Sequence, residues 1–251
     1  MGLGCLGASV VSSGGLVRAA DVGQEAPSAE AALADGAFSA LTLPARVGST
    51  RAFAWGLAGY DSSRKGPLLD STAEVQLWGP IALRGSATYS NDTRRMRPSV
   101  AARGQFLHQS AHALDASLTV FYKAEGFTES EGEIETALSV GRTFERLTLI
   151  GNLVYGQDPE GNERDGELRL SLFHQRGGIS FGLDARARMA IGPQQGKASA
   201  VEPTFDAMGG ATAAAALGPL VLFAEVGPSV FRLAGVNAAG MEALGGVGSV
   251  F

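Results

Sequence analysis

The chain has 251 residues, a net charge of −5 and 45% hydrophobic residues, while only 18% of its residues are charged. This balance disfavours a disordered chain, and no basic block suggests a nucleic-acid partner. No run approaches the ~20 consecutive apolar residues of a membrane-spanning helix, and the abundance of glycine disfavours an ordinary helical domain. We therefore expect a folded protein that binds no nucleic acid.

The first residues are small and mildly apolar, and they end in Val17-Arg18-Ala19, where Val-x-Ala resembles a signal-peptidase site cutting after Ala19. We predict a signal peptide over 1–19 and a periplasmic linker over 20–49, whose first part is rich in Ala, Glu and Pro. The alternative is a flexible cytoplasmic N-terminus. The single cysteine, Cys5, falls within the predicted signal peptide, so we expect no disulfide, metal or other cofactor in the mature chain.

From about residue 50 onward, apolar and polar residues alternate in short stretches. In 179–191 one phase is apolar, with Ile179, Phe181 and Leu183, while the other contains Asp184 and Arg186. The same split recurs in 81–91, 112–125 and 166–174. Because a strand sends successive side chains to opposite faces, each stretch predicts a strand with one apolar and one polar face.

We predict about twelve strands, at 50–60, 71–79, 81–91, 97–108, 112–125, 132–143, 147–157, 166–174, 179–191, 203–217, 219–232 and 238–251. Tight connections such as Gly79-Pro80 and Gly218-Pro219 alternate with longer polar ones, which is typical of a barrel with a periplasmic and an external end. Pro228 indicates a bulge or a shorter strand, and the small residues of 209–217 leave about ten or fourteen strands open. The segment 38–43 is either an extra strand or a piece tucked into the lumen.

Aromatic residues mark the expected strand ends. Tyr60, Tyr89, Tyr122 and Tyr155 each come just before a long connection and in the apolar phase, and Trp78 lies beside a tight turn. These positions predict an aromatic girdle at the membrane interfaces. The alternative is a β-sandwich with core tyrosines at its strand ends.

The chain ends on Phe251 after a strand-like stretch, which resembles the C-terminal insertion signal of Gram-negative outer-membrane barrels, although Ser249 and Gly245 are smaller than usual there. With the alternation and the girdle, 50–251 resembles the class of Gram-negative outer-membrane β-barrel proteins. The resemblance implies an all-β, closed antiparallel transmembrane barrel in the bacterial outer membrane. It also implies outer-membrane lipid and the barrel-assembly machinery as partners, and we expect a monomer.

No catalytic motif is present, because the glycine-rich stretches match neither a P-loop nor a dinucleotide-binding pattern. His108, His112 and His174 lie near tight connections and are interpreted as solvated turn residues, with a loose metal pair of His108 and His112 as the alternative. We therefore predict a protein that is not an enzyme. A membrane-embedded hydrolase stays open as a third hypothesis, which requires a Ser/His pair on one rim.

The polar phase carries charges of both signs, including Glu74, Lys123 and Glu167. The residues that we predict to line the lumen are Arg84, Arg103, Asp115, Glu133, Glu135, Arg169, Asp184, Arg186, Arg188 and Glu225. They either line an aqueous pore or form a self-satisfying network that fills it. We predict a narrow channel or passive transporter for small polar solutes, with low conductance and weak ion selectivity because opposite charges face each other. The alternative is a non-conducting barrel with a salt-bridged lumen and an envelope-structural or loop-mediated binding role.

Overall fold

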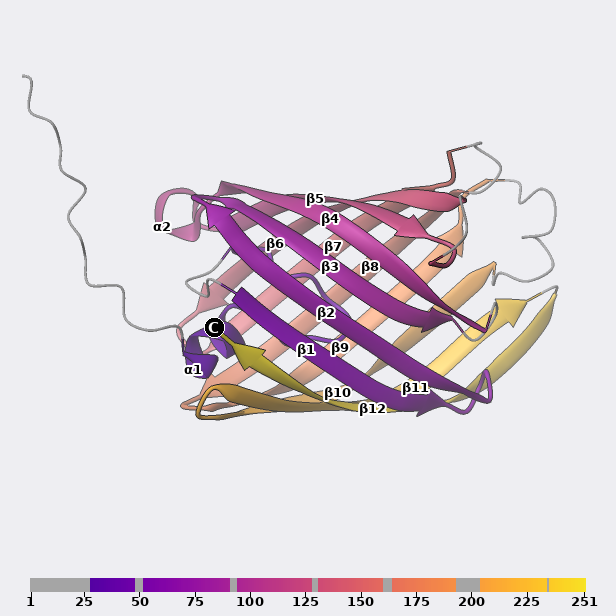
Figure 1. The fold of residues 1–251 in the computed structure, drawn as a ribbon. Coiled ribbons are helices and arrows are strands. Elements are labelled where there is room, and N and C mark those ends of the chain that lie inside the picture. Colours follow the sequence, from indigo (N-terminus) through magenta and orange to yellow (C-terminus); the bar gives the residue numbers. More distant parts are fainter. Residues whose placement is uncertain are drawn as a thin grey trace, which may run out of the picture.

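The computed structural model describes residues 28–47, 52–90, 94–127, 131–159, 164–192, 204–233 and 235–251. Antiparallel strands β1 to β12 close into one barrel, in which β1 (Ala52–Asp61) pairs with β12 (Val236–Val250) and every other strand pairs with its neighbours in sequence (Figure 1). This confirms the predicted closed antiparallel barrel and its strand number. None of the described helices is long and apolar enough to cross a bilayer.

The predicted strands agree with the observed ones to within a few residues, except that β2 starts well inside the predicted loop. The remaining strands are β2 (Gly66–Trp78), β3 (Ile81–Ser90), β4 (Arg95–Leu107), β5 (Asp115–Ala124), β6 (Gly132–Phe144), β7 (Leu147–Gln157), β8 (Arg164–Arg176), β9 (Ile179–Ala190), β10 (Phe205–Leu217) and β11 (Leu220–Leu233).

The two ends of the barrel differ in their connections. One end, here called the turn end, carries the tight connections at 79–80, 145–146, 177–178 and 218–219, the short helix α2 (Gln109–His112), and the last residue Phe251. The other, here called the loop end, carries the connections at 62–65, 91–94, 125–131, 158–163, 191–204 and 234–235. The asymmetry is weaker than predicted, because the first and the last of these connections are short.

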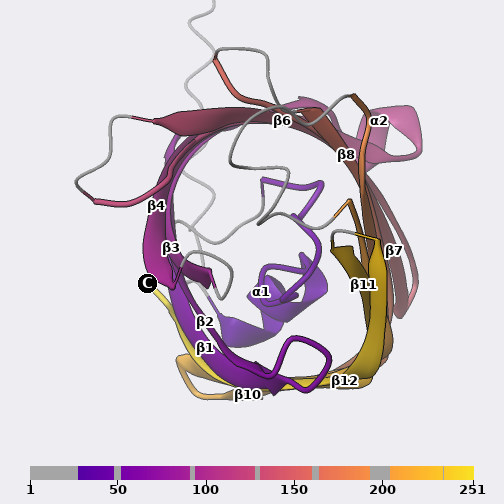
Figure 2. The ribbon, with the colours of Figure 1, turned by 90° about the vertical axis from the view of Figure 1, so that its right-hand side faces the viewer.

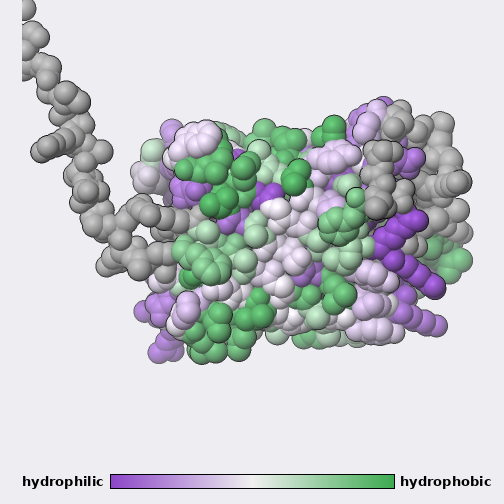
Figure 3. All heavy atoms as spheres, viewed as in Figure 1, coloured by the Kyte–Doolittle hydropathy of each residue, from purple (hydrophilic) through white to green (hydrophobic). Residues whose placement is uncertain are grey.

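Alternate residues of the strands face outward and inward. Large apolar side chains such as Leu149, Leu170 and Leu183 are exposed on the outer wall, whereas Thr119 and Asn152 from the other phase are buried in the lumen. Figure 3 shows apolar and weakly polar side chains over the wall and strongly hydrophilic ones gathered toward the loop end. An apolar exterior around a polar interior is the arrangement that a lipid-facing barrel requires.

Pro228 does not produce the predicted bulge. β10 and β11 keep the same register on either side of it, with Met208 opposite Ser229 and Ala211 opposite Val226. Bridge pairs to β10 are missing only opposite Gly227 and Pro228 in this described ladder. A Cβ on Gly227 would lie 2.0 Å from the carbonyl oxygen of Gly209, so glycine lets the two backbones stay close where the ladder is interrupted.

The largest departure from the sequence prediction is the segment 28–47, here called the plug. It was predicted as part of a periplasmic linker, but it lies inside the barrel at the turn end, where helix α1 (Ala29–Ala34) contacts β9, β10 and β12 (Figure 2). Of the two alternatives for 38–43, the structure shows the segment tucked into the lumen. The predicted signal peptide and the first part of the predicted linker, 1–27, lie outside the described residues.

An apolar core anchors the plug at the turn end. The Phe38 ring lies 5.8 Å from that of Phe53 and 6.5 Å from that of Phe223, measured between centroids, and Trp55 packs edge-on against Phe223. A Cβ on Gly248 would lie 2.0 Å from the Phe38 ring, so a side chain there would displace it. The inward face of β1 is therefore aromatic and apolar, which the assignment of the polar phase to the lumen did not anticipate.

A charge on the lipid-facing wall should oppose membrane insertion. We expect Leu170→Arg, near the middle of β8, to lower the free energy of unfolding in lipid vesicles by about 2–4 kcal/mol, because the guanidinium would lie in hydrocarbon. Urea titration of the reconstituted protein measures this, and Leu170→Phe is the control that keeps the site apolar. Equal stability of the arginine and phenylalanine variants would mean that this face does not contact lipid.

Candidate functional site

The lumen contains a cavity of about 330 Å³ between the plug and the loop end. Residues 39–43 of the plug line it on one side, and inward-facing residues of the strands form its walls. The volume lies at the lower end of the roughly 300–1,000 Å³ that is usual for small-molecule sites. The lumen therefore has room for a small solute on the loop-end side of the plug.

The strand walls hold the irregular part of the plug through its backbone. Asn152 on β7 accepts a hydrogen bond from the Leu43 N–H at 2.5 Å and donates one to the Leu43 carbonyl at 3.0 Å. Arg103 donates to the Pro44 carbonyl at 2.8 Å, and Gln105 accepts from the Val47 N–H at 2.9 Å. Backbone groups that enter a lumen without secondary structure need such partners.

Where the plug closes the cavity, hydroxyl groups and one carboxylate join it to β8 and β9. Ser171 donates to the Thr42 hydroxyl at 2.7 Å, and Thr42 in turn donates to Ser39 at 2.8 Å. Ser39 donates to the Asp184 carboxylate at 3.4 Å. The Leu43 side chain packs among buried apolar residues of the wall, which include Phe121 and Val154. The plug is thus attached by both polar and apolar contacts.

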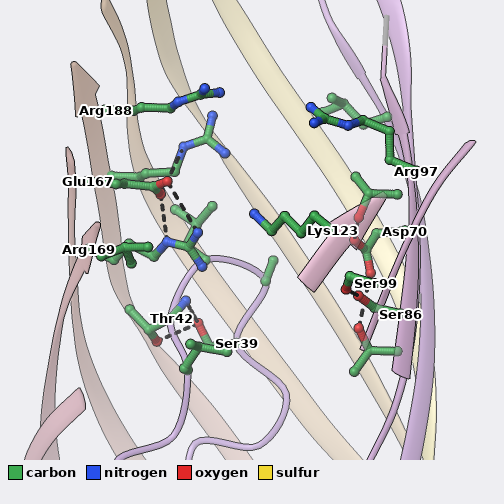
Figure 4. A pocket seen from close by; sticks show the side chains of 18 of the residues that line it. Ser39, Thr42, Asp70, Ser86, Arg97, Ser99, Lys123, Glu167, Arg169 and Arg188 are labelled. Atoms are coloured by element: carbon green, nitrogen blue, oxygen red, sulfur yellow. Dashed lines mark hydrogen bonds and ion pairs between the residues drawn. The ribbon is translucent and has the colours of Figure 1, made fainter. Parts of the chain in front are cut away.

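One wall of the cavity, formed by β8 and β9, carries a ladder of ion pairs. Arg169 donates two hydrogen bonds to Glu167, at 2.6 and 3.2 Å. Arg186 donates to Asp206 of the adjacent β10 at 2.8 Å, and Arg188 donates to Asp165. Figure 4 shows Arg188 and Arg169 pointing into the cavity. Each base on this wall therefore has a carboxylate on its own or a neighbouring strand.

The opposite wall, formed by β2 to β6, is also paired. Glu74 accepts from Arg84 at 2.9 Å and from Arg103, and Lys123 donates to Glu135. Arg97 lies within 4.0 Å of Glu133. Hydroxyls complete this wall, because Thr88 and Thr72 donate to Asp70 and the Ser86 and Ser99 oxygens lie 2.5 Å apart.

Half of the ten residues predicted to line the lumen line the cavity, namely Arg84, Glu135, Arg169, Arg186 and Arg188. Arg103 and Glu133 pair with other residues of the second wall without lining the cavity, and the last three lie elsewhere. Asp115 is buried near the turn end and accepts hydrogen bonds from the Gln105 side chain and the Gln109 backbone N–H at the start of α2. Asp184 and Glu225 are buried and are not among the residues that line the cavity. Alternation gives the face of a residue but not its height in the barrel, so the sequence could not separate these positions.

Several charged residues of the site were not predicted from the sequence. Asp70 and Asp165 fell in predicted loops and Arg97 at the first position of a predicted strand, because the observed strands begin earlier than predicted. Arg64, in the connection between β1 and β2, pairs with Asp206. The plug was missed altogether. Longer strand estimates would have recovered the first three, whereas nothing in the sequence of the linker indicated where it lies.

The predicted girdle and turn residues are placed as follows. Tyr60, Tyr122 and Tyr155 are exposed at the loop-end halves of their strands, Tyr89 is half-buried, and Trp78 is exposed at the turn end. Phe251 is exposed, and its N–H donates to the Ala52 carbonyl. The three histidines, His108, His112 and His174, lie toward the turn end, and no cluster of three metal-binding side chains forms among the described residues.

No family model matches this chain, and no curated protein matches its sequence. Solved structures match its shape. The match to the NanC porin structure spans 79% of this chain and 99% of the porin chain, with 10% identity and a TM-score of 0.57. The match to the outer membrane channel DcaP of Acinetobacter baumannii spans 78% of this chain and 71% of the DcaP chain, with 12% identity and a TM-score of 0.45. The match to LpxR from Salmonella typhimurium spans 80% of this chain and 100% of the LpxR chain, with 7% identity and a TM-score of 0.46.

The chain has the outer-membrane β-barrel fold. The NanC likeness carries this conclusion, and the apolar outer wall and polar lumen agree with it. The resemblance and the outer-membrane location inferred from the sequence are thereby confirmed. The identity is too low to carry more than the fold, so the activity of this barrel has to be argued from its own lumen.

Asn152 offers a direct test of how the wall holds the plug. We expect Asn152→Ala to speed amide hydrogen exchange at Thr42 and Leu43 by roughly ten-fold or more, because two hydrogen bonds worth about 0.5–1.5 kcal/mol each are lost. Exchange measured by mass spectrometry on the folded barrel reports this. Ser139→Ala is the matched control, since Ser139 is buried and pairs in register with Asn152 but its hydroxyl has no hydrogen-bond partner in the described structure. Similar exchange in the two variants would show that the two Asn152 hydrogen bonds do not hold the plug.

Proposed function

We propose that this barrel is a channel for small polar solutes whose turn end is closed by the plug. The observation that carries the proposal is the charged cavity of about 330 Å³, which ends on residues 39–43 of the plug. A lumen built only as a salt-bridged core would have its charged groups packed against each other. Here the two charged walls are separated by a space of the size that a small solute needs.

Passage through the barrel requires the plug to move, and its two parts are held differently. Helix α1 and Phe38 belong to an apolar core with Phe53, Phe223 and Val250. Residues 39–47 are held by wall side chains that bind their backbone groups or hydroxyls, each bond being worth about 0.5–1.5 kcal/mol, and by the packing of the single Leu43 side chain against the wall. We infer that residues 39–47 shift to open the floor of the cavity while α1 stays anchored.

The second candidate is the non-conducting barrel that the sequence analysis left open. The close packing of α1 and Phe38 against the turn end of the wall favours it. The two candidates differ in one respect, which is whether residues 39–47 ever leave the floor of the cavity. That the protein is not an enzyme stays a prediction.

A reversible lock on the plug separates the two candidates. A Cβ on Gly141 would lie 2.9 Å from the Cβ of Ala45, so cysteines at both positions can form a disulfide after a small shift. On a Cys5→Ser background, we expect the oxidised Ala45→Cys/Gly141→Cys variant to show no conductance in planar bilayers. Reduction should restore the small conductance of the parent protein, because the plug can then move again.

The controls are the two single-cysteine variants, which should conduct equally under oxidising and reducing conditions. Asn152→Ala should conduct more often than the parent, since its plug is held less firmly. If neither the reduced double variant nor Asn152→Ala conducts above the lipid baseline at any voltage, the channel function is wrong. The non-conducting barrel would then be the better account.

A further inference from the structure

Seven basic and six acidic side chains line the cavity, and they differ in accessibility. In four ion pairs at the cavity the basic side chain is more exposed than its acidic partner, whereas Arg97, at 19%, is less exposed than its partner Glu125, at 39%. The exposed fractions of base and acid are 29% and 9% for Arg186–Asp206, 30% and 11% for Arg188–Asp165, 30% and 9% for Lys123–Glu135, and 19% and 8% for Arg169–Glu167. The surface that a solute would meet is therefore basic.

The difference follows from side-chain length. Arg and Lys carry their charge at the end of a long stem, whereas Asp and Glu hold theirs close to the strand. When such partners stand on the same wall, the carboxylate lies recessed and the cation ends nearer to the axis of the barrel. Because the Coulomb energy falls with distance, the nearer cations dominate the potential inside the cavity.

The remaining acidic residues of the cavity lining do not reverse this balance. Asp61 is buried and accepts from the Ser63 and Ser229 hydroxyls. Asp70 accepts from two threonine hydroxyls, and Glu242 is buried. These carboxylates are thus either turned to partners in the wall or shielded from the space between the walls.

The basic groups also face one another across the cavity. Figure 4 shows Arg188 and Arg169 extending from one wall and Arg97 and Lys123 from the other, with their nitrogen atoms directed into the space between. A guanidinium has five N–H donors, and one carboxylate occupies only some of them. Arg186, for example, donates to Asp206 through one terminal nitrogen, and its Nε lies 3.8 Å from Glu167, so these two contacts do not involve its other terminal nitrogen.

We propose that the cavity binds small solutes that carry two anionic oxygen groups, carboxylate or phosphate, one held by the arginines of β8 and β9 and the other by Lys123. The inference rests on the proposed channel function and names its solute class. It replaces the expectation of weak ion selectivity, which counted the charges of the lumen without their exposure. Two facing basic walls fit a solute with a negative charge at each end better than a neutral or cationic one.

Binding to the intact barrel in detergent micelles tests this without relying on conduction. The probes are succinate, inorganic phosphate, putrescine and 1,4-butanediol, since succinate, putrescine and butanediol share a four-carbon length and differ in charge. We expect calorimetric titration to detect binding of succinate, weaker binding of inorganic phosphate because it offers only one anionic group, and no binding of putrescine or butanediol. Binding of putrescine or phosphate as tight as that of succinate, or no binding of succinate, would overturn the proposal.

Two substitutions test the origin of the effect. We expect Arg186→Gln to weaken succinate binding at least ten-fold, while Arg142→Gln, an exposed arginine stacked on Phe144 near the turn end, leaves it unchanged. Glu135→Gln should strengthen succinate binding several-fold, because it removes a recessed negative charge beside Lys123. A Glu135→Gln protein that is folded by circular dichroism and binds succinate more weakly would contradict the proposal.

The binding experiment tests the solute class of the cavity, and the conductance experiment tests the channel function, so one proposal can be wrong while the other holds. Anion binding without conduction in the reduced double-cysteine variant would support the binding site and contradict the channel function. Conduction without anion binding would leave the channel in place and show that its solutes belong to another class.

Discussion

The pairing of every backbone N–H and C=O group inside the bilayer is the constraint on which the rest of this structure depends. It forces β12 back onto β1, and it turns one phase of every strand toward lipid and the other toward the lumen. Only in the lumen, away from hydrocarbon, can an irregular segment such as the plug lie at membrane depth. Even there its backbone groups need partners, which Asn152, Arg103 and Gln105 supply from the wall.

The same constraint shapes the charges. Polar residues that must face inward meet each other across a confined space, where an unpaired ion is costly, so the walls carry bases and acids as neighbours. Pairing along one wall places Arg169 beside Glu167 and Lys123 beside Glu135. Since the cation has the longer stem, a cavity lined by acids as well as bases presents a basic surface to whatever enters it.

The sequence could predict what strand geometry alone decides. Alternation in 179–191 was enough to place Arg186 and Arg188 on the face opposite Leu183, and tight turns located most strand ends. Alternation failed on β1, where the outward residues before Tyr60 are Ala and Gly, because neither phase is clearly the apolar one and Phe53 and Trp55 face inward. The plug could not be predicted, because a short Ala-rich stretch takes its structure from the wall that surrounds it. The position of Asp115 along the barrel axis was not predictable from the sequence either, since it depends on packing at the turn end.

Barrel width explains why a plug is needed at all. Barrels of about eight strands are filled by their own side chains, while those of roughly 16–18 strands leave a water channel. Twelve strands give an intermediate lumen that inward side chains alone do not fill. Small residues such as Ala29, Ala32 and Ala37 let α1 and the following turn fit against the wall at one end, where aromatic rings complete the core. The other end keeps its charged walls apart, so one chain combines an anchored core with a cavity large enough for a solute.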